Sequence, residues 1–424
     1  MEKLIISQNI HWKQRYKNLY SRSILTKIID RLSLRQIEVL QGIRRSGKST
    51  IFKLLINYLS KNINPKEILY INLDDPFFVP FSKDATKFYD VIEYAKKLTG
   101  REVKYLFLDE IQAIDGWERF VKSAYDSELF KKIFVTGSNS SFLNSKLSIL
   151  LTGRYLSTMV YPLTFKEILQ INKIDSYIDL VEQKAKSLSI VDDMMQNGSF
   201  VEVFDAPNFA KRDIVKHYYE TILFKDCVLN NSIREVKSFR DLSFYILNNA
   251  SSLYSYLSLA KSVGINDTST KEYIRYLEDS FMLYEVKQFS YSLKEQNSSK
   301  KKIYLSDNGF MLLGLKFSSN LGLLLENLVF SELLKSGFEL YFYNKDFECD
   351  FIAKKEDKLI ALQVCYELNE KNLKREIRGL NKLPFNCDEK YIITYNQEDN
   401  SKDIKIVPFW KFAFELPYLE NLTS

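Results

Sequence analysis

Residues 42–49 read Gly42-Ile43-Arg44-Arg45-Ser46-Gly47-Lys48-Ser49, which fits the full Gly-x-x-x-x-Gly-Lys-Ser/Thr pattern of a phosphate-binding P-loop. A short β-like run at 37–40 precedes it, and a segment with helical spacing of apolar residues, 49–59, follows it. The two glycines let the backbone turn its N–H groups toward phosphate oxygens. Lys48 is expected to reach the β- and γ-phosphates, and the Ser49 hydroxyl to ligate Mg²⁺. We therefore predict that Gly42 through Thr50 bind ATP together with magnesium.

A second apolar run, Tyr105–Leu108, ends in two carboxylates, Asp109 and Glu110. An acid at the carboxyl end of a strand beside the P-loop is placed to hold the magnesium shell, so we assign Asp109 to the metal together with Ser49. Glu110 is then the expected base that orients and polarises the attacking water. An acidic strand end is commonplace by itself, but in combination with the P-loop it predicts ATP hydrolysis.

A third apolar run, 133–136, leads into Gly137-Ser138-Asn139-Ser140. We expect this strand end to lie between the other two motifs, where Asn139 or Ser138 could contact the γ-phosphate or the water. The alternative is a helix N-cap, for which both residue types are favoured.

Arg154, in Leu151-Thr152-Gly153-Arg154, is a candidate arginine finger. It would stabilise the charge of the transition state, either within the chain or from a neighbouring subunit of a homo-oligomer. The alternative is a surface salt bridge.

The composition limits the class of protein. The chain has 424 residues, 46% hydrophobic and 27% charged, as in a globular protein of several domains. Its 60 basic and 54 acidic residues give a formal net charge of +6, which is compatible with a nucleic-acid partner but does not require one. There is no apolar run long enough for a membrane span, so we expect no membrane association. The four cysteines and two histidines have no metal-binding spacing, and we expect the reducing cytoplasm.

The chain divides into four predicted parts. Alternating strands and helices over 1–161 predict an α/β unit with a parallel sheet, and 162–229 is a helical lid or connector. Residues 230–307 read as three helices and a hairpin, the order of a winged helix. Residues 308–424 predict a small α/β domain. The loop of the hairpin is expected to carry Lys294, Lys300, Lys301 and Lys302.

These motifs resemble the AAA-type P-loop ATPases, in particular a prokaryotic group with a winged-helix segment and a nuclease-like C-terminal domain of unknown function. The resemblance covers nearly the whole chain and implies the use of ATP and Mg²⁺. The chain departs from the group at 197–202, Asn-Gly-Ser-Phe-Val-Glu, where the group usually has a Gly-Gly-Phe-Pro-Glu turn. The motifs that carry the resemblance are the Arg-Arg of the P-loop, LFLDEIQ (106–112), VTGSNS (135–140), GRYL (153–156), PLTFKE (162–167), SDNGF (306–310), ENLVFSEL (326–333) and ECDFI (348–352).

The C-terminal part also resembles the restriction-endonuclease-type core, in which carboxylates hold magnesium and a lysine stabilises the developing charge. The resemblance assigns Glu326 and Asp350 to the first two carboxylate positions. Gln363 replaces the third acid and Cys365 replaces the lysine, so we expect a degenerate domain that does not cleave. Lys354 is the residue that could take over the role of the lysine.

Three functions fit these observations. The leading one is a Mg²⁺-dependent ATPase whose nucleotide state moves the appended domains, which would bind double-stranded DNA through the basic hairpin. The alternatives are a nucleotide-state switch that acts on a protein partner with little turnover, and an ATP-regulated nuclease. The Asp109–Glu110 pair favours turnover over the switch.

Overall fold

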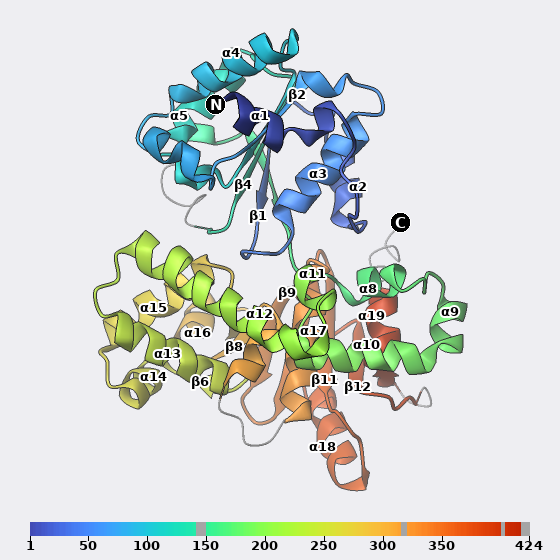
Figure 1. Ribbon diagram of the computed structural model, residues 1–424. Helices are drawn as coiled ribbons and strands as arrows, with labels where there is room; N and C mark the ends of the chain where they lie inside the picture. The colour runs from blue at the N-terminus through green and yellow to red at the C-terminus, as the bar shows by residue number, and fades with distance from the viewer. Residues whose placement is uncertain (141–149, 315–319, 400–402, 417–424) are drawn as a thin grey trace. The chain divides into compact units, whose positions relative to one another are not determined.

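The computed structural model describes residues 1–140, 150–314, 320–399 and 403–416 (Figure 1). The chain forms two compact units. The first consists of Met1–Tyr161 with Asp279–Phe281, and the second of Pro162–Glu278 with Met282–Ser424. The division into four domains remains a prediction. No helix among the described residues is long and apolar enough to cross a membrane.

The first unit is built on a parallel sheet whose described part has five strands in the order β2-β3-β4-β1-β5. The predicted parallel sheet is therefore confirmed. Four of its strands are almost entirely buried, as expected for strands covered on both faces. The sequence did not indicate β5, an edge strand that mixes polar and apolar residues. The strands are β1 (Ile37–Gln41), β2 (Ile68–Asn72), β3 (Tyr105–Asp109), β4 (Lys132–Gly137) and β5 (Tyr155–Met159).

Helices cover both faces of this sheet (Figure 1). On one face α2 and α3 pack over Phe107 and Phe134, whose rings stack at 4.2 Å. On the other face α1, α4 and α5 bury the opposite side of the same strands. The helices are α1 (Glu2–Gln8), α2 (Ile24–Asp30), α3 (Lys48–Leu59), α4 (Lys87–Thr99) and α5 (Trp117–Asp126), with short 3₁₀ turns η1 (Ile10–Trp12), η2 (Pro65–Glu67), η3 (Pro76–Phe81) and η4 (Ile111–Ala113).

The second unit begins with helices, as the sequence predicts for 162–229. Further helices follow in the next segment and among the C-terminal strands. The helices are α8 (Phe165–Ile171), α9 (Tyr177–Glu182), α10 (Lys184–Asn197), α11 (Val201–Phe204), α12 (Asn208–Thr221), the π-helical η5 (Ile222–Leu229), α13 (Val236–Asn248), α14 (Tyr256–Val263), α15 (Asp267–Asp279), α16 (Leu293–Ser298), η6 (Asn308–Leu313), α17 (Leu321–Lys335), α18 (Glu370–Asn381) and α19 (Phe409–Glu415).

One mixed sheet runs through the second unit, in the order β13-β12-β11-β10-β9-β7-β8-β6 over the described ranges. The predicted hairpin is present as the antiparallel pair β7–β8. Strand β7 also pairs in parallel with β9, so the hairpin and the C-terminal strands share one sheet. The strands are β6 (Leu253–Tyr254), β7 (Leu283–Gln288), β8 (Lys301–Leu305), β9 (Glu339–Asn344), β10 (Glu348–Lys355), β11 (Lys358–Val364), β12 (Glu389–Thr394) and β13 (Lys405–Pro408).

The structure corrects the predicted position of the hairpin lysines. Lys294 and Lys300 are exposed in the connection between β7 and β8. Lys301 and Lys302 instead lie on β8 with only 9% and 3% of their surface exposed. Strand β8 pairs with β7 on one side and with β6 on the other, so its side chains pack into the unit. The expectation that all four lysines form a basic loop is therefore wrong.

Candidate nucleotide-binding site

The P-loop connects the carboxyl end of β1 to the first turn of α3. Gly42 has a φ of 149° and Gly47, the N-cap of α3, a φ of 99°. A Cβ atom on Gly42 would lie 2.1 Å from the backbone oxygen of Val160, so the loop passes the end of β5 where a side chain does not fit. The N–H groups in the first turn of α3 lack partners within the helix and open onto this loop.

Lys48 and Ser46 show how well the loop suits a phosphate. The Lys48 amine is buried and donates to the carbonyl oxygens of Gly42 at 2.9 Å and Ile43 at 3.1 Å. The Ser46 hydroxyl is buried and has no hydrogen-bond partner among the described residues. A phosphate oxygen would supply the missing acceptor, and a buried hydroxyl without one costs roughly 1–3 kcal/mol. These residues therefore fit the triphosphate of a nucleotide.

The two predicted metal ligands come together. Asp109 accepts hydrogen bonds from the hydroxyls of Ser49, Thr136 (2.5 Å) and Tyr70 (2.7 Å). Burial raises the pKa of Asp109, and the neighbouring Glu110 raises it further. A carboxylate and a hydroxyl are the hard oxygen ligands that Mg²⁺ takes beside phosphates. In the described residues no group of three or more His, Cys, Asp and Glu could hold a metal alone, so the phosphates would have to complete such a shell.

Glu110 lies just beyond β3 in a left-handed conformation, with φ 54° and ψ 48°. Its N–H donates to the Thr136 hydroxyl at 2.8 Å, and its carboxylate accepts hydrogen bonds from Gln112 and Ser138. Burial raises the pKa of Glu110, but the positive charges of Lys48 and Arg44 outweigh it and the pKa is lowered. Glu110 is therefore ionised at neutral pH, the state that a general base requires.

Strand β4 lies between β1 and β3, where the sequence places it. Ser138 and Asn139 follow it and are both buried. Ser138 is tied to this site by its bonds with Glu110 and Gln112. A contact between Asn139 and the γ-phosphate remains a prediction.

The structure does not bring Arg154 to this site. Its carbonyl oxygen accepts the N–H of Ile37 at 2.8 Å, at the amino ends of β1 and β5. The P-loop follows the carboxyl end of β1, about 13–17 Å away at 3.3 Å per residue. The Arg154 side chain pairs with Asp126 at 2.9 Å and is one-third exposed. The distance between Arg154 and the P-loop therefore excludes an arginine finger within the same chain. An arginine finger supplied by a neighbouring subunit remains a prediction.

Three residues of the site escaped the sequence analysis. Arg22 is buried and donates to the carbonyl oxygens of Ser46 at 3.1 Å and Tyr161 at 2.7 Å, which ties the P-loop to the last residue of the first unit's main segment. Tyr70 and Thr136 hold Asp109. The sequence signal that could have indicated Tyr70 and Thr136 is their place on β2 and β4, the strands on either side of β3.

The second unit contains a lysine–carboxylate cluster, formed by Lys302, Glu326, Glu348 and Asp350. The Lys302 amine lies 3.3 Å from Glu326, 3.2 Å from Glu348 and 3.4 Å from Asp350. Burial lowers the pKa of Lys302, but the three carboxylates outweigh it and the pKa is raised. Burial and the neighbouring Glu326 raise the pKa of Asp350 to about 7. The cluster therefore places one ammonium group beside three carboxyl groups.

The lysine–carboxylate cluster lines a cavity of about 580 Å³. Gln363 is also in its wall, and its side-chain oxygen accepts the N–H of Asp350 at 3.3 Å. Lys354, the lysine predicted to replace the missing one, is exposed and is not among the residues that line this cavity. The lysine that the structure brings to Glu326 and Asp350 is Lys302 of β8.

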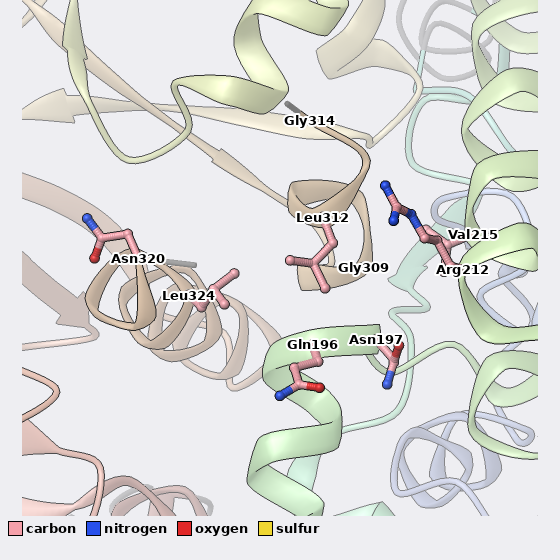
Figure 2. A pocket seen from close by; sticks show the side chains of 9 residues that line it. All are labelled: Gln196, Asn197, Arg212, Val215, Gly309, Leu312, Gly314, Asn320 and Leu324. Carbon is pink, nitrogen blue, oxygen red and sulfur yellow. The ribbon is translucent and has the colours of Figure 1, made fainter. Parts of the chain in front are cut away.

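A smaller cavity of about 260 Å³ lies between α10, α12, η6 and α17 (Figure 2). Among the described residues that line it, Arg212 is the charged one, and the remaining residues are amides, glycines and aliphatics. This cavity gathers no set of groups for catalysis. Its lining residues are Gln196, Asn197, Arg212, Val215, Gly309, Leu312, Gly314, Asn320 and Leu324.

Comparison with known proteins agrees with this geometry. Residues 34–169 match the sequence profile of the AAA domain. Residues 189–320 and 321–412 match two domains of unknown function, DUF8612 and DUF4143. Strand order, P-loop and profile define the first unit as an AAA-type P-loop NTPase domain.

Two relatives cover most of the chain. The uncharacterized protein MJ1544 of Methanocaldococcus jannaschii is 34% identical over 96% of this chain and 94% of its own length. An uncharacterized protein of Haemophilus influenzae is 30% identical over 79% of this chain and 83% of its own. The chain belongs to the family of these two proteins.

The similarity to two solved structures is weaker. The Aeropyrum pernix ORC1 protein, in complex with DNA, is 12% identical, with a TM-score of 0.34 over 70% of this chain and 92% of that one. AMPPCP-bound DnaA from Aquifex aeolicus is 13% identical, with a TM-score of 0.30 over 60% of this chain and 86% of that one.

Proposed function

We propose that the protein is a Mg²⁺-dependent ATPase. The observation that carries the proposal is the convergence of Lys48, Ser49, Asp109 and an ionised Glu110 at the carboxyl ends of β1 and β3. Magnesium, when bound, would neutralise charge on the β- and γ-phosphates. Ser49 and Asp109 would hold it, and Lys48 would leave the carbonyls of the loop for phosphate oxygens. Glu110 would accept a proton from the attacking water.

Steady-state ATP hydrolysis by the purified chain tests this proposal. E110Q removes the base and should lower kcat by about 10²–10⁴-fold while leaving ATP affinity intact. E93Q is a matched control, because Glu93 is exposed on α4 and pairs only at the surface with Lys96. Equal turnover in wild type, E93Q and E110Q would exclude Glu110 as the base. ATP binding without turnover in the wild-type chain would favour the nucleotide-state switch.

We further propose a homo-oligomer in which Arg154 faces the ATP of a neighbouring subunit. Support comes from its position away from its own P-loop and from its partly exposed guanidinium. Mass measurement with and without a non-hydrolysable ATP analogue tests this proposal, and a chain that stays monomeric in both conditions would contradict it.

A double-stranded DNA partner is proposed for the second unit. The order α13, β6, α14, α15, β7 and β8, with β6 paired to β8, supports the predicted winged helix. Two basic side chains, Lys294 and Lys300, are exposed between β7 and β8.

Fluorescence anisotropy with a labelled duplex at several salt concentrations tests DNA binding. K294A/K300A should weaken binding and reduce the salt slope by up to about 1.8, at roughly 0.9 per phosphate contact. The control pair K61A/K83A, two exposed lysines of the first unit, should leave both quantities unchanged. Unchanged affinity and slope in K294A/K300A would direct the search to a protein partner.

A specific observation also favours a nuclease activity. Lys302 lies within 3.4 Å of Asp350 and 3.3 Å of Glu326, so a lysine is available where Cys365 offers none. Glu326 and Asp350 would hold a metal ion, and Lys302 would stabilise developing phosphate charge. Duplex cleavage in Mg²⁺ or Mn²⁺ that disappears in both D350N and K302M would support this function. Absence of cleavage by the wild-type chain, with and without ATP, would exclude it.

A further inference from the structure

Gln112 lies beside the proposed base, to which its side-chain amide donates a hydrogen bond. It follows Glu110 in the 3₁₀ turn η4, and its side chain folds back toward β3 and β4. The amide nitrogen Nε2 donates to Glu110 Oε2 and, at 3.4 Å, to Ser138 Oγ. The amide oxygen Oε1 is buried and has no hydrogen-bond partner among the described residues.

The carboxylate of Glu110 accepts hydrogen bonds, and this fixes the orientation of the Gln112 side-chain amide. Turning it by 180° would point the carbonyl oxygen of Gln112 at the carboxylate of Glu110, and two acceptors would then face each other. With Nε2 on Glu110, Oε1 remains the group without a donor. A buried acceptor without a donor is unfavourable, so a donor is expected when the site is filled.

The reactants of ATP hydrolysis limit which group can donate a hydrogen bond to Gln112 Oε1. The γ-phosphate oxygens of ATP are acceptors, and Lys48 and Arg44 mark the neighbourhood of Glu110 as the phosphate end of the nucleotide. The attacking water is the reactant at this end that has two O–H groups to donate. Glu110 can accept one of them, and the orphaned oxygen of Gln112 can accept the other.

We propose that Gln112 holds the attacking water together with Glu110, contacting the water through Oε1 and positioning Glu110 through Nε2. This inference rests on the proposed ATPase function. In the step, the water oxygen bonds to the γ-phosphorus, and the bond from that phosphorus to the bridging oxygen breaks. Glu110 takes one proton of the water, the other stays on the new phosphate as it donates to Gln112, and ADP leaves. Two acceptors orient the water better than one, which raises kcat and leaves ATP binding unchanged.

Single-turnover and steady-state ATP hydrolysis by the full chain test the proposal with Q112M. Methionine matches the length of glutamine and keeps the packing, but it has neither the donor nor the acceptor. We expect kcat to fall by about 10²-fold with KM changed by less than about threefold, since only the reacting water loses a contact. Q112E keeps an acceptor oxygen but loses the donor, so its rate should also fall.

Q8M is the matched control. Gln8 also lies in the first unit, and both ends of its amide are bonded to the backbone of Asn72, at 3.2 Å and 2.9 Å. Losing those bonds should lower thermal stability while kcat of the folded protein stays within about twofold.

A double-variant cycle distinguishes positioning from a structural role. If Gln112 and Glu110 act on one water, E110Q/Q112M should be only a few-fold slower than E110Q, because the two losses are not additive. Fully multiplicative losses, or a kcat of Q112M equal to that of Q8M, would overturn the inference while the ATPase stands. Recovery of Q112M at high Mg²⁺ would also overturn it, by making Oε1 a metal ligand. Absence of turnover in the wild-type chain would overturn both the inference and the proposed function.

Discussion

Replacing Gly42 by alanine tests how tightly the P-loop is built against the end of β5. The added Cβ would lie 2.1 Å from the backbone oxygen of Val160 and 3.1 Å from its carbonyl carbon. Backbone atoms cannot rotate away as a side chain can. Val160 is also fixed by its N–H, which donates to the Gln41 carbonyl at 2.7 Å. Either the P-loop or the end of β5 must therefore move.

Gly100 provides the reference for the size of the effect. It has a φ of 64°, and a Cβ there would meet nothing within 4 Å. G100A should therefore cost only the left-handed backbone penalty, about 1–2 kcal/mol. At Gly42, with φ 149°, the backbone penalty is about 1–3 kcal/mol before the contact with Val160 is counted. We expect G42A to lose more than about 3 kcal/mol in total, as lost stability, lost ATP affinity or both.

Urea unfolding and binding of a fluorescent ATP analogue measure the two losses separately. Trp12 and Trp117 lie in the first unit and Trp410 in the second, so in a W410F background tryptophan fluorescence reports unfolding of the first unit. If the loop keeps its shape, the unfolding midpoint of G42A should drop well below that of G100A. If the loop moves, stability should recover and ATP affinity should fall instead. A G42A protein that matches G100A in both measurements would refute the close approach of the loop to Val160.

Three further expectations follow from the two units. K48A should lower ATP affinity by at least about tenfold in a filter-binding assay, because charge-assisted hydrogen bonds to the phosphates are worth more than about 1.4 kcal/mol. A K48A protein that binds ATP as tightly as the wild type would contradict the P-loop assignment. Asp350 has its pKa raised to about 7 in the folded state, so its contribution to stability is full below pH 4 and is lost as the pH rises through 7. D350N should remove this dependence, at most about 1.4 kcal/mol per pH unit in urea titrations, and an unchanged profile would exclude Asp350 as its source. Mixing R154A with E110Q should restore part of the ATP turnover if Arg154 acts across subunits, whereas full activity of R154A alone would exclude the finger.

The sequence predicts the first unit well because its signals are local. The P-loop, the acidic end of β3 and the buried strands are each visible within a few adjacent residues. Strand β5 lacks such a signal, because Tyr155–Met159 alternates irregularly at the sheet edge. Arg22 could not be assigned either, because its partners Ser46 and Tyr161 are 24 and 139 residues away.

Lys302 is a residue whose exposure is predicted wrongly from the neighbouring sequence. Three consecutive lysines before an apolar run are typical of a solvated loop. Lys300 is exposed as that pattern suggests, but Lys302 is buried beside carboxylates 24 and 48 residues further along, Glu326 on α17 and Asp350 on β10. A run of charged residues in the sequence therefore says little about exposure when the neutralising partners come from distant helices and strands.

The continuous sheet of the second unit limits how its parts can be exchanged in evolution. The matched segments 189–320 and 321–412 meet where β7 pairs with β9, and the lysine–carboxylate cluster takes Lys302 from the first segment and its acids from the second. Recombination that replaced only one segment would separate β7 from its paired strand β9. It would also leave the buried carboxylates of Glu326 and Asp350 without the ammonium group of Lys302. A buried pair broken in this way costs about 3–5 kcal/mol. The two segments are thus expected to be inherited together, and a relative that lacks the lysine should also lack the acids.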